Sequence, residues 1–210
     1  MTLDNLIKNN FMDALIAGDR IICSKIIKKL LKDQIPIIDI YEQVITQALY
    51  GIGEIWESGE ISVATEHLAS AMVEGMLNDL FSDIISSEKL GKTAVLVCVE
   101  NERHQIGIKM VSDIFEKNGW NTYYLGSGVP LVELIRFIKE KNPDVLALSI
   151  TLTYNIKYLE KTIKEIQTQF PYQMILIGGQ GLRESEGELL QDNYKIRYIP
   201  DLYLLDMLLC

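Results

Sequence analysis

The periodicity of apolar residues changes near residue 92, and this change constrains the fold more than any other feature of the 210-residue chain. Up to about residue 88, apolar residues recur at the i, i+4 spacing of amphipathic helices, with almost no strand signal. Beyond residue 92, short apolar runs alternate with helical segments, a pattern typical of a doubly wound parallel sheet. We therefore expect two domains, a helical one over 1–88 and an α/β one over 92–210.

The helical half is predicted to contain four helices with short connections, which form an antiparallel bundle. Asp19 and Ser62 are the candidate N-caps of the second and fourth helices, and Pro36 and Asp39 open the third. The four helices are expected near 3–16, 19–32, 39–56 and 62–85. The α/β half is predicted to have a five-stranded Rossmann-like or flavodoxin-like sheet. Its strands are expected near 93–99, 121–125, 144–150, 173–178 and 196–199, and its helices near 105–118, 130–141, 154–168, 182–190 and 202–209.

The charge of the chain argues against a nucleic-acid-binding surface. The chain has 20 basic and 29 acidic side chains, a formal net charge of −9, whereas such a surface needs a basic stripe. One predicted helix is an exception, because Lys25, Lys28, Lys29 and Lys32 fall near one of its faces. We interpret this set as a solvated helix face.

The cysteines and the hydropathy of the sequence favour a reducing, cytoplasmic compartment. Cys23, Cys98 and Cys210 are isolated and lack metal-ligand spacing, and an odd, scattered set is typical of a reducing environment. The sequence has no signal peptide and no apolar run long enough to span a membrane. We expect a cytoplasmic protein that binds neither membranes nor, directly, nucleic acid.

His104 is the main candidate for a functional residue. It follows the apolar run 93–99, so it falls in the first strand-to-helix loop, at the sheet edge where such folds bind ligands. Glu102 is placed to accept a hydrogen bond from one ring nitrogen, which leaves the other for a metal. Gly107 lets a bulky ligand approach the backbone. An isolated H-x-x-G is also typical of a solvated loop histidine, so the interpretation depends on what lies nearby.

Three further features fall on the same edge of the predicted sheet. The segment 126–130 follows the second strand, Ser149 and Thr151 end the third, and the pair Gly178 and Gly179 ends the fourth. Each has an ordinary explanation as a cap or a turn. Together they predict a slot of small hydroxyls and absent side chains beneath His104.

This arrangement resembles the cobalamin-binding Rossmann-like domain, whose pattern is D-x-H-x-x-G, then S-x-L, then G-G. The chain has these elements in the same order, as Glu102-x-His104-x-x-Gly107, Ser149-x-Thr151 and Gly178-Gly179. The intervals of 41 and 26 residues between them match the family. There are two departures, because Glu102 replaces an aspartate and Thr151 replaces a leucine.

The resemblance implies specific roles. His104 would replace the dimethylbenzimidazole of the cofactor as the lower ligand of cobalt, with Glu102 as its hydrogen-bond partner. Ser149 would hydrogen-bond the displaced nucleotide tail, and the three glycines would leave space for it. The cofactor-binding residues implied in this domain are Glu102, Arg103, His104, Gln105, Ile106, Gly107, Ser149, Thr151, Gly178 and Gly179, with His104 as the metal ligand.

The helical half resembles the cap of one class of cobalamin protein. Trp56, Glu66 and His67 match the W-x9-E-H motif of the light-responsive repressors of the MerR class, in which these residues contact an adenosyl group. The alternative is a core tryptophan and an ordinary carboxylate near a helix N-terminus. Glu57 stands where those repressors have a histidine that captures cobalt after photolysis. The predicted helices occupy 1–88, so we expect no DNA-binding domain in this sequence.

We therefore expect a non-enzymatic, photoreceptor-like sensor or regulatory protein that holds adenosylcobalamin base-off and acts on a protein partner or by self-association. The alternative is a corrinoid carrier subunit of a methyltransferase system, with methylcobalamin as its cofactor. A methyl group needs a small, apolar lid, whereas Trp56, Glu66 and His67 suit a larger, polar nucleoside. A flavodoxin-like domain for another ligand would leave the joint spacing of the motifs unexplained.

Overall fold

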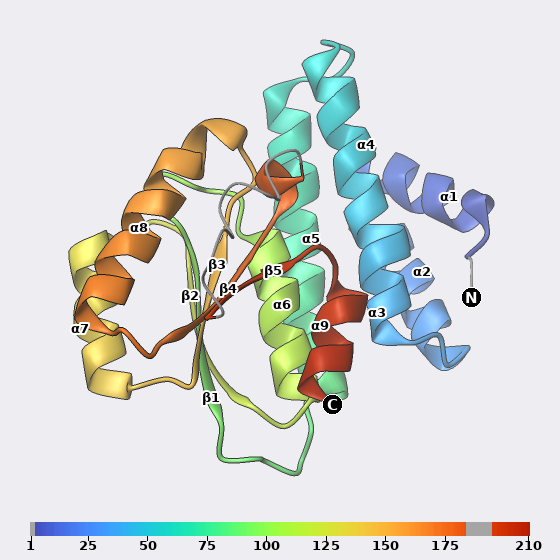
Figure 1. Ribbon diagram of the computed structural model, residues 1–210. Helices are drawn as coiled ribbons and strands as arrows, with labels where there is room; N and C mark the ends of the chain where they lie inside the picture. Colours follow the sequence, from blue (N-terminus) through green and yellow to red (C-terminus); the bar gives the residue numbers. More distant parts are fainter. Residues whose placement is uncertain (1–2, 184–194) are drawn as a thin grey trace. The chain divides into compact units, whose positions relative to one another are not determined.

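The computed structural model describes residues 3–183 and 195–210. The chain divides into two compact units, Met1–Ile84 and Ile85–Cys210 (Figure 1). The first unit is helical, and the second contains a five-stranded sheet in which all strands are parallel. The predicted fold class is therefore confirmed.

The helices of the first unit begin at capping residues that the sequence indicates. Oδ1 of Asp19 accepts the N–H of Ile22 at 2.9 Å, and Oγ of Ser62 accepts the N–H of Thr65 at 3.1 Å. The side chain of Asp4 caps the first helix, which therefore starts two residues later than expected. The helices are α1 (Asn5–Ile16), α2 (Arg20–Lys32), α3 (Ile37–Ile40), α4 (Thr46–Glu57) and α5 (Val63–Ile84).

The third predicted helix is continuous but not uniformly α-helical. A π-helical segment, Tyr41–Ile45, joins α3 directly to α4. Its residues Tyr41, Val44 and Ile45 are fully buried, so the segment packs as part of the bundle core. Apolar spacing alone does not distinguish an α-turn from a π-turn, because both place apolar residues on one face.

The sheet of the second unit has the order β2-β1-β3-β4-β5. Its strands are β1 (Thr93–Cys98), β2 (Asn121–Gly126), β3 (Val145–Ser149), β4 (Met174–Gly178) and β5 (Ile196–Ile199), and its helices are α6 (Ile106–Lys117), α7 (Leu131–Lys141), α8 (Ile156–Gln169) and α9 (Leu202–Leu209). The helix predicted near 182–190 lies largely outside the described residues. The described chain there ends in a 3-10 turn, Gln180–Leu182.

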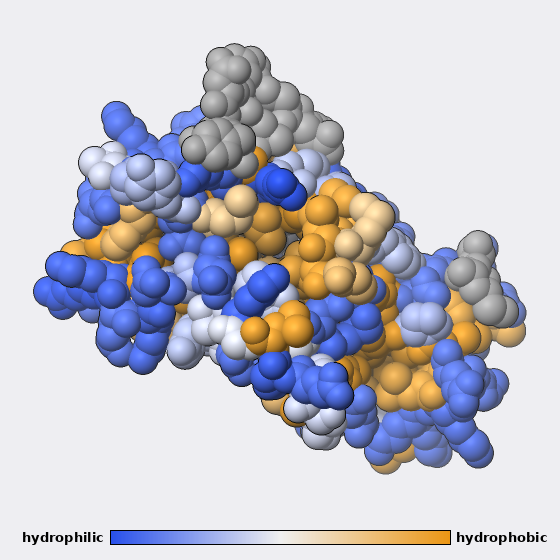
Figure 2. All heavy atoms as spheres, turned by 60° about the horizontal axis from the view of Figure 1, so that its bottom comes forward, coloured by the Kyte–Doolittle hydropathy of each residue, from blue (hydrophilic) through white to orange (hydrophobic). Residues whose placement is uncertain are grey.

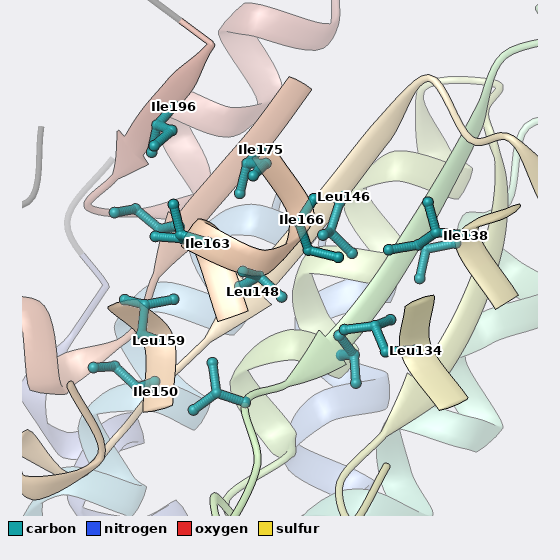
Figure 3. Packing of buried hydrophobic residues seen from close by; sticks show 14 of the residues in the cluster. Leu134, Ile138, Leu146, Leu148, Ile150, Leu159, Ile163, Ile166, Ile175 and Ile196 are labelled. Carbon is teal, nitrogen blue, oxygen red and sulfur yellow. The ribbon is translucent and has the colours of Figure 1, made fainter. Parts of the chain in front are cut away.

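One face of the sheet packs against α7 and α8. Apolar side chains of these helices meet those of β3, β4 and β5 (Figure 3). The labelled members of this cluster are Leu134, Ile138, Leu146, Leu148, Ile150, Leu159, Ile163, Ile166, Ile175 and Ile196. Fully burying a side chain of this size contributes about 1.5–3 kcal/mol, so the cluster holds the strand ends in place.

The strand order reverses between β1 and β3. The chain passes from β1 through α6 to β2 on one side, and then to β3 on the other side of β1. In open α/β sheets, ligands bind at the carboxyl ends of the strands where the order reverses. The loops that follow β1 and β3 therefore define the candidate site.

Hydrophilic residues cover much of the face shown in Figure 2, and apolar residues also reach the surface there, as is usual for folded proteins. Among the described residues, no helix combines the length and the apolar character needed to cross a bilayer.

Candidate functional site

The loop between β1 and α6 buries Glu102 and exposes His104. Asn101 adopts a left-handed conformation with φ of 69°, which asparagine tolerates better than most residues. The N–H of Glu102 then donates to the carbonyl of Val99 at 3.0 Å. The Glu102 side chain is completely buried, whereas half of the His104 side chain is exposed. The loop therefore presents an imidazole on a buried carboxylate.

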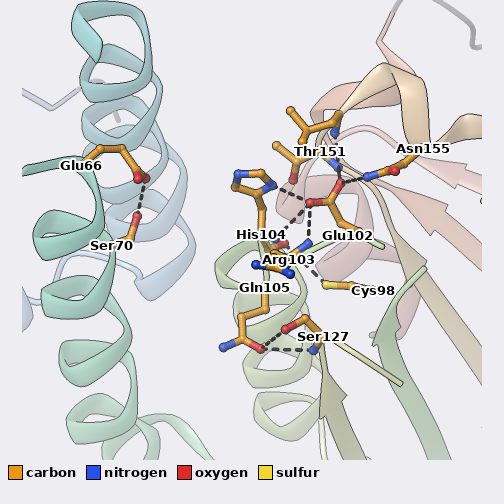
Figure 4. A network of polar contacts seen from close by, with 11 residues as sticks. Glu66, Ser70, Cys98, Glu102, Arg103, His104, Gln105, Ser127, Thr151 and Asn155 are labelled. Atoms are coloured by element: carbon orange, nitrogen blue, oxygen red, sulfur yellow. Dashed lines mark hydrogen bonds and ion pairs between the residues drawn. The ribbon is translucent and has the colours of Figure 1, made fainter. Parts of the chain in front are cut away.

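One oxygen of Glu102 organises its own loop. Oε1 accepts a hydrogen bond from Nδ1 of His104 at 2.5 Å, and from the N–H groups of Arg103 at 2.9 Å and His104 at 3.0 Å. The longer side chain of glutamate thus reaches the imidazole, as predicted (Figure 4). Arg103 contributes its main chain to this contact, and its side chain is exposed.

The other oxygen of Glu102 fastens this loop to the end of β3. Oε2 accepts the N–H groups of Thr151 at 2.8 Å and Leu152 at 3.1 Å, together with Nδ2 of Asn155 at 3.1 Å (Figure 4). Because Thr151 acts here through its main chain, its side chain does not determine this contact.

These contacts set the protonation state of the site. Burial by itself would raise the pKa of Glu102, but hydrogen bonds from His104, Thr151 and Asn155 outweigh it and lower the pKa to about 2. At neutral pH the Glu102 carboxylate is ionised and accepts a hydrogen bond from the Nδ1–H group of His104. Nε2 is therefore the ring nitrogen that would bind a metal.

The lowered pKa predicts a specific acid sensitivity. Because the pKa of Glu102 falls from 4.5 to about 2 on folding, its contacts stabilise the native state above pH 4.5, and this contribution is lost as the pH falls toward 2. A shift of this size corresponds to about 3 kcal/mol of unfolding free energy. Urea unfolding should therefore give a lower free energy of unfolding for Glu102→Gln than for the wild type at pH 7. This difference in free energy should narrow as the pH is lowered to 3.

Glu100→Gln, in the same loop, is the control and should follow the wild type over this range. If the difference in unfolding free energy between Glu102→Gln and the wild type stays constant down to pH 3, the lowered pKa of Glu102 is contradicted.

Gln105 ties the same loop to the end of β2. Its Oε1 accepts the N–H of Ser127 at 3.2 Å and the Ser127 hydroxyl at 3.1 Å (Figure 4). The histidine loop is thus attached to the strand ends on both sides of β1. Ile106 follows as the first, half-buried residue of α6.

The glycines of the motif differ in what the fold requires of them. A Cβ at Gly179 would lie 2.0 Å from the carbonyl oxygen of Ile150, and Gly179 has a φ of 108°, so the main chain there requires glycine. A Cβ at Gly178 would lie 3.0 Å from the carbonyl oxygen of Ile199. A Cβ at Gly107 would meet nothing within 4 Å. Packing therefore does not require glycine at position 107. The missing side chain instead leaves open space beside His104.

Ser149 lies at the carboxyl end of β3, with Cys98 and Gly178 as its register partners. It is 6 % exposed, so it is buried at this end of the strand. Burial raises the pKa of the Cys98 thiol to about 12, with a further contribution from the Glu102 carboxylate. Cys98 is therefore a neutral thiol at this edge.

The helical unit carries the remaining predicted residues. Trp56 lies in the last turn of α4 and is 42 % exposed, which is high for so large an aromatic side chain. Glu66, in the first turn of α5, accepts the Ser70 hydroxyl at 2.8 Å with Oε1 (Figure 4). Its Oε2 contacts Nδ1 of His67. The carboxylate of Glu66 is thereby held in one orientation.

Asn155 and Ser70 belong to these networks, but we did not predict them from the sequence. Ser70 follows Glu66 by four residues, which is the spacing of neighbours on a helix face. The hydrogen bond between them could therefore have been predicted from the sequence. Asn155 is fully buried and meets Glu102 from 53 residues away. Only its position at the start of a helix, after a strand end, signals a role.

The residues of the β1–α6 loop fit a corrin. Half of the imidazole of His104 is exposed, its Nδ1 is engaged by Glu102, and a Cβ at Gly107 would meet no other atom within 4 Å. Cobalt accepts imidazole nitrogen, and a carboxylate partner orients such a ligand.

Comparison with known proteins identifies the family. Residues 92–199 and 7–80 each match a family model described as a B12 binding domain. The HTH-type transcriptional repressor CarH of Myxococcus xanthus is 28% identical over 155 residues, which cover 72% of this chain and 50% of the repressor. The dimethylamine corrinoid protein of Methanosarcina barkeri is 26% identical over 160 residues, which cover 75% of this chain and 74% of that protein.

A solved structure supports the fold along the whole chain. The monomethylamine corrinoid protein of Methanosarcina barkeri superposes with a TM-score of 0.82 over 98% of both chains, at 16% identity. The chain spans about half the length of the repressors it matches. Because one model covers more than half of the sequence, the chain belongs to the B12 binding domain family and is a cobalamin-binding protein.

Proposed function

We propose that the protein is a non-enzymatic sensor or regulatory protein that holds adenosylcobalamin base-off, with His104 on cobalt. The observation that favours an adenosyl over a methyl upper ligand is the oriented carboxylate of Glu66 on α5. Glu66 is oriented by Ser70 and His67, and the exposed ring of Trp56 adds a flat apolar face. An oriented carboxylate suits ribose hydroxyls, whereas a methyl group gives it nothing to bind.

His104 would supply the lower ligand in this function. Glu102 keeps Nδ1 protonated and the ring oriented, and its contacts to Thr151 and Asn155 prevent the carboxylate from moving away. Gly107 leaves room for the ring system. Ser149, Gly178 and Gly179 lie at the same sheet edge, where we place the displaced nucleotide tail.

The signal we propose is light, because bound adenosylcobalamin supplies a photolabile cobalt–carbon bond. The CarH relative is by name a transcriptional repressor, and its matched region covers half of its length. In the present chain the response would pass to a protein partner or to self-association.

A methyl-carrier function is the second candidate, and a specific similarity favours it. The dimethylamine corrinoid protein matches over 74% of its own length, more than CarH does. As a carrier, the chain would act with a methyltransferase partner and would not be catalytic on its own. The two candidates differ in the upper ligand, so a substitution at Glu66 separates them.

Illumination provides a test of the sensor function. Glu57 is an exposed carboxylate at the end of α4, and a carboxylate is a poorer ligand than imidazole for cobalt. We expect light to change the absorbance spectrum of the adenosylcobalamin-loaded protein to one with a single histidine ligand. Glu57→His is expected to yield a two-histidine spectrum under the same light.

Glu54→His, one turn earlier on the same helix, is the matched control and should behave as the wild type does. A two-histidine spectrum in the unmodified protein would assign the second ligand to His67 and refute the role given to Glu57.

A further inference from the structure

Two hydroxyl side chains at the end of β3 have no hydrogen-bond partner in the described part of the chain. Ser149 is 6 % exposed, and Thr151, two residues later, is half-buried. The side-chain oxygen of neither residue forms a hydrogen bond with another described residue. A buried hydroxyl without a partner costs free energy, so a ligand that supplies the partner is favoured.

The two hydroxyls lie on the same side of the sheet. Leu146, Leu148 and Ile150 alternate along β3, and all three belong to the apolar cluster beneath α7 and α8 (Figure 3). The N–H of Ile150 donates to a carbonyl of β4 at 3.1 Å, so the pairing of the strands continues beyond Ser149. Because successive side chains of a strand point to opposite faces, Ser149 and Thr151 both face away from that cluster.

The main chain fixes the position of Thr151. Its N–H donates to Oε2 of Glu102 at 2.8 Å (Figure 4). On its other side, a Cβ at Gly181 would lie 3.1 Å from the carbonyl oxygen of Thr151, so this turn packs closely against it. The Thr151 hydroxyl is therefore held in one place by contacts that do not use it.

The surroundings of these hydroxyls are uncharged and include missing side chains. Cys98, Ser149, Gly178 and Ile199 form a row of register partners across four strands, and none of them carries a charge. The thiol of Cys98 is neutral and donates to the carbonyl of His104 at 3.5 Å. The row therefore presents one hydroxyl, beside a position without a side chain, for a neutral group to contact.

The nearest charge indicates which part of a nucleotide tail suits Thr151. The Glu102 carboxylate, which accepts the Thr151 N–H, is ionised at neutral pH. A phosphate beside Thr151 would be repelled by this negative charge. The heterocyclic base at the end of the tail is neutral, and an N–H donor on it would be attracted. The base therefore suits this position better than the phosphate does.

Lower bases differ in what they offer a hydroxyl. The outer ring of dimethylbenzimidazole carries two methyl groups and no hydrogen-bonding group, so it would leave a buried hydroxyl unpaired. The outer ring of adenine carries an amino group that donates and ring nitrogens that accept. A leucine, as in the family pattern, has no hydroxyl that needs a partner, whereas Thr151 has one.

We propose that Thr151 selects a cobamide whose lower base is a purine such as adenine over one whose lower base is dimethylbenzimidazole. The Thr151 hydroxyl bonds the base, while its main chain continues to hold Glu102. This inference rests on the proposed base-off binding, with His104 on cobalt and the displaced tail at the end of β3.

A substitution that removes only the hydroxyl tests the proposal. Thr151→Val keeps the shape of the side chain, and Thr151→Ser keeps the hydroxyl. Thr153→Val is the matched control, because it makes the same change at an exposed position of the next turn. Circular dichroism checks that each variant is folded.

Each protein is titrated with three cofactors that share one upper ligand. They are cobalamin, the cobamide with adenine as its lower base, and cobinamide, which has no nucleotide tail. Absorbance gives the dissociation constant of each cofactor and also shows whether a histidine is bound to cobalt. The two readouts keep the ligand of cobalt separate from the preference for a base.

We expect the wild type, Thr153→Val and Thr151→Ser to bind the adenine cobamide about tenfold or more tightly than cobalamin. Thr151→Val should lose about tenfold in affinity for the adenine cobamide, because a hydrogen bond to the base is lost. Its affinity for cobalamin should stay the same or rise, since no hydroxyl is then left unpaired. The affinity for cobinamide should be equal in all four proteins.

Three results would overturn the proposal. The first is a wild type that binds cobalamin as tightly as the adenine cobamide, and the second is a preference that Thr151→Val leaves unchanged. The third is an equal loss of both cobamides in Thr151→Val with cobinamide unaffected, which would assign the hydroxyl to the ribose or phosphate that both share. If no cofactor gives a histidine-ligated spectrum, the proposed function itself is refuted, whereas a histidine-ligated spectrum without a base preference refutes this inference alone.

Discussion

Replacing His104 with alanine is expected to remove the lower ligand of cobalt and to change the visible spectrum of the bound cobalamin to the base-off form. The imidazole is half exposed, and its Nδ1 is held at 2.5 Å from Glu102, so the loop supplies one oriented nitrogen ligand. No other histidine lies in the α/β unit, because the second histidine of the chain is His67. We expect affinity for cobalamin to fall by at least about 10–100-fold, the range seen when only the hydrogen-bond partner of a metal ligand is lost.

Two additions make this experiment specific. Free imidazole added to His104→Ala should restore a nitrogen-ligated spectrum, because the substitution leaves space above Glu102. His67→Ala is the control, and it should keep the lower-ligand spectrum of the wild type. An unchanged spectrum in His104→Ala would refute the assignment of the cobalt ligand without affecting membership of the family.

Replacing Glu66 with alanine is expected to separate the two candidate functions. Glu66 is held by Ser70 and His67, so its carboxylate is already oriented for a ligand that donates hydrogen bonds. Losing a hydrogen bond to a charged group costs about 1.5–3 kcal/mol, which corresponds to about tenfold or more in the dissociation constant of adenosylcobalamin. The affinity for methylcobalamin should hardly change. Equilibrium titration with each cofactor measures both constants.

Asp79→Ala is the matched control, since Asp79 is an exposed carboxylate on the same helix and should affect neither cofactor. If Glu66→Ala weakens both cofactors equally, adenosyl recognition by Glu66 is excluded and the methyl-carrier function becomes the better explanation.

The local features of this chain were predictable from its residues. Strand and helix positions follow the period of the apolar residues, because side chains return to the same face about every 3.6 residues in a helix and every two in a strand. The caps at Asp19 and Ser62 could be predicted because such bonds join residues two or three positions apart. His104 could be placed on the ligand-binding edge because it follows a strand directly.

The contacts that complete the site depend on the folded sheet. Glu102 meets Thr151 and Asn155, which lie 49 and 53 residues further along the chain, only because β1 and β3 are neighbours. The strand order, unlike the strand pattern, follows from how the whole sheet packs. The requirement for glycine at 179 likewise arises because the main chain passes Ile150 too closely for a Cβ.

The sequence by itself was enough to predict which residues would form a cofactor site, since the order and spacing of the motifs are properties of the chain alone. Only the tertiary structure decided how these residues are held. Glu102 was expected to contact one imidazole, whereas in the structure it accepts six hydrogen bonds from two loops. The physical reason is that a buried carboxylate has lost its water and needs hydrogen-bond donors from the protein instead. The folded structure supplies these donors from segments that are distant in sequence but close in space.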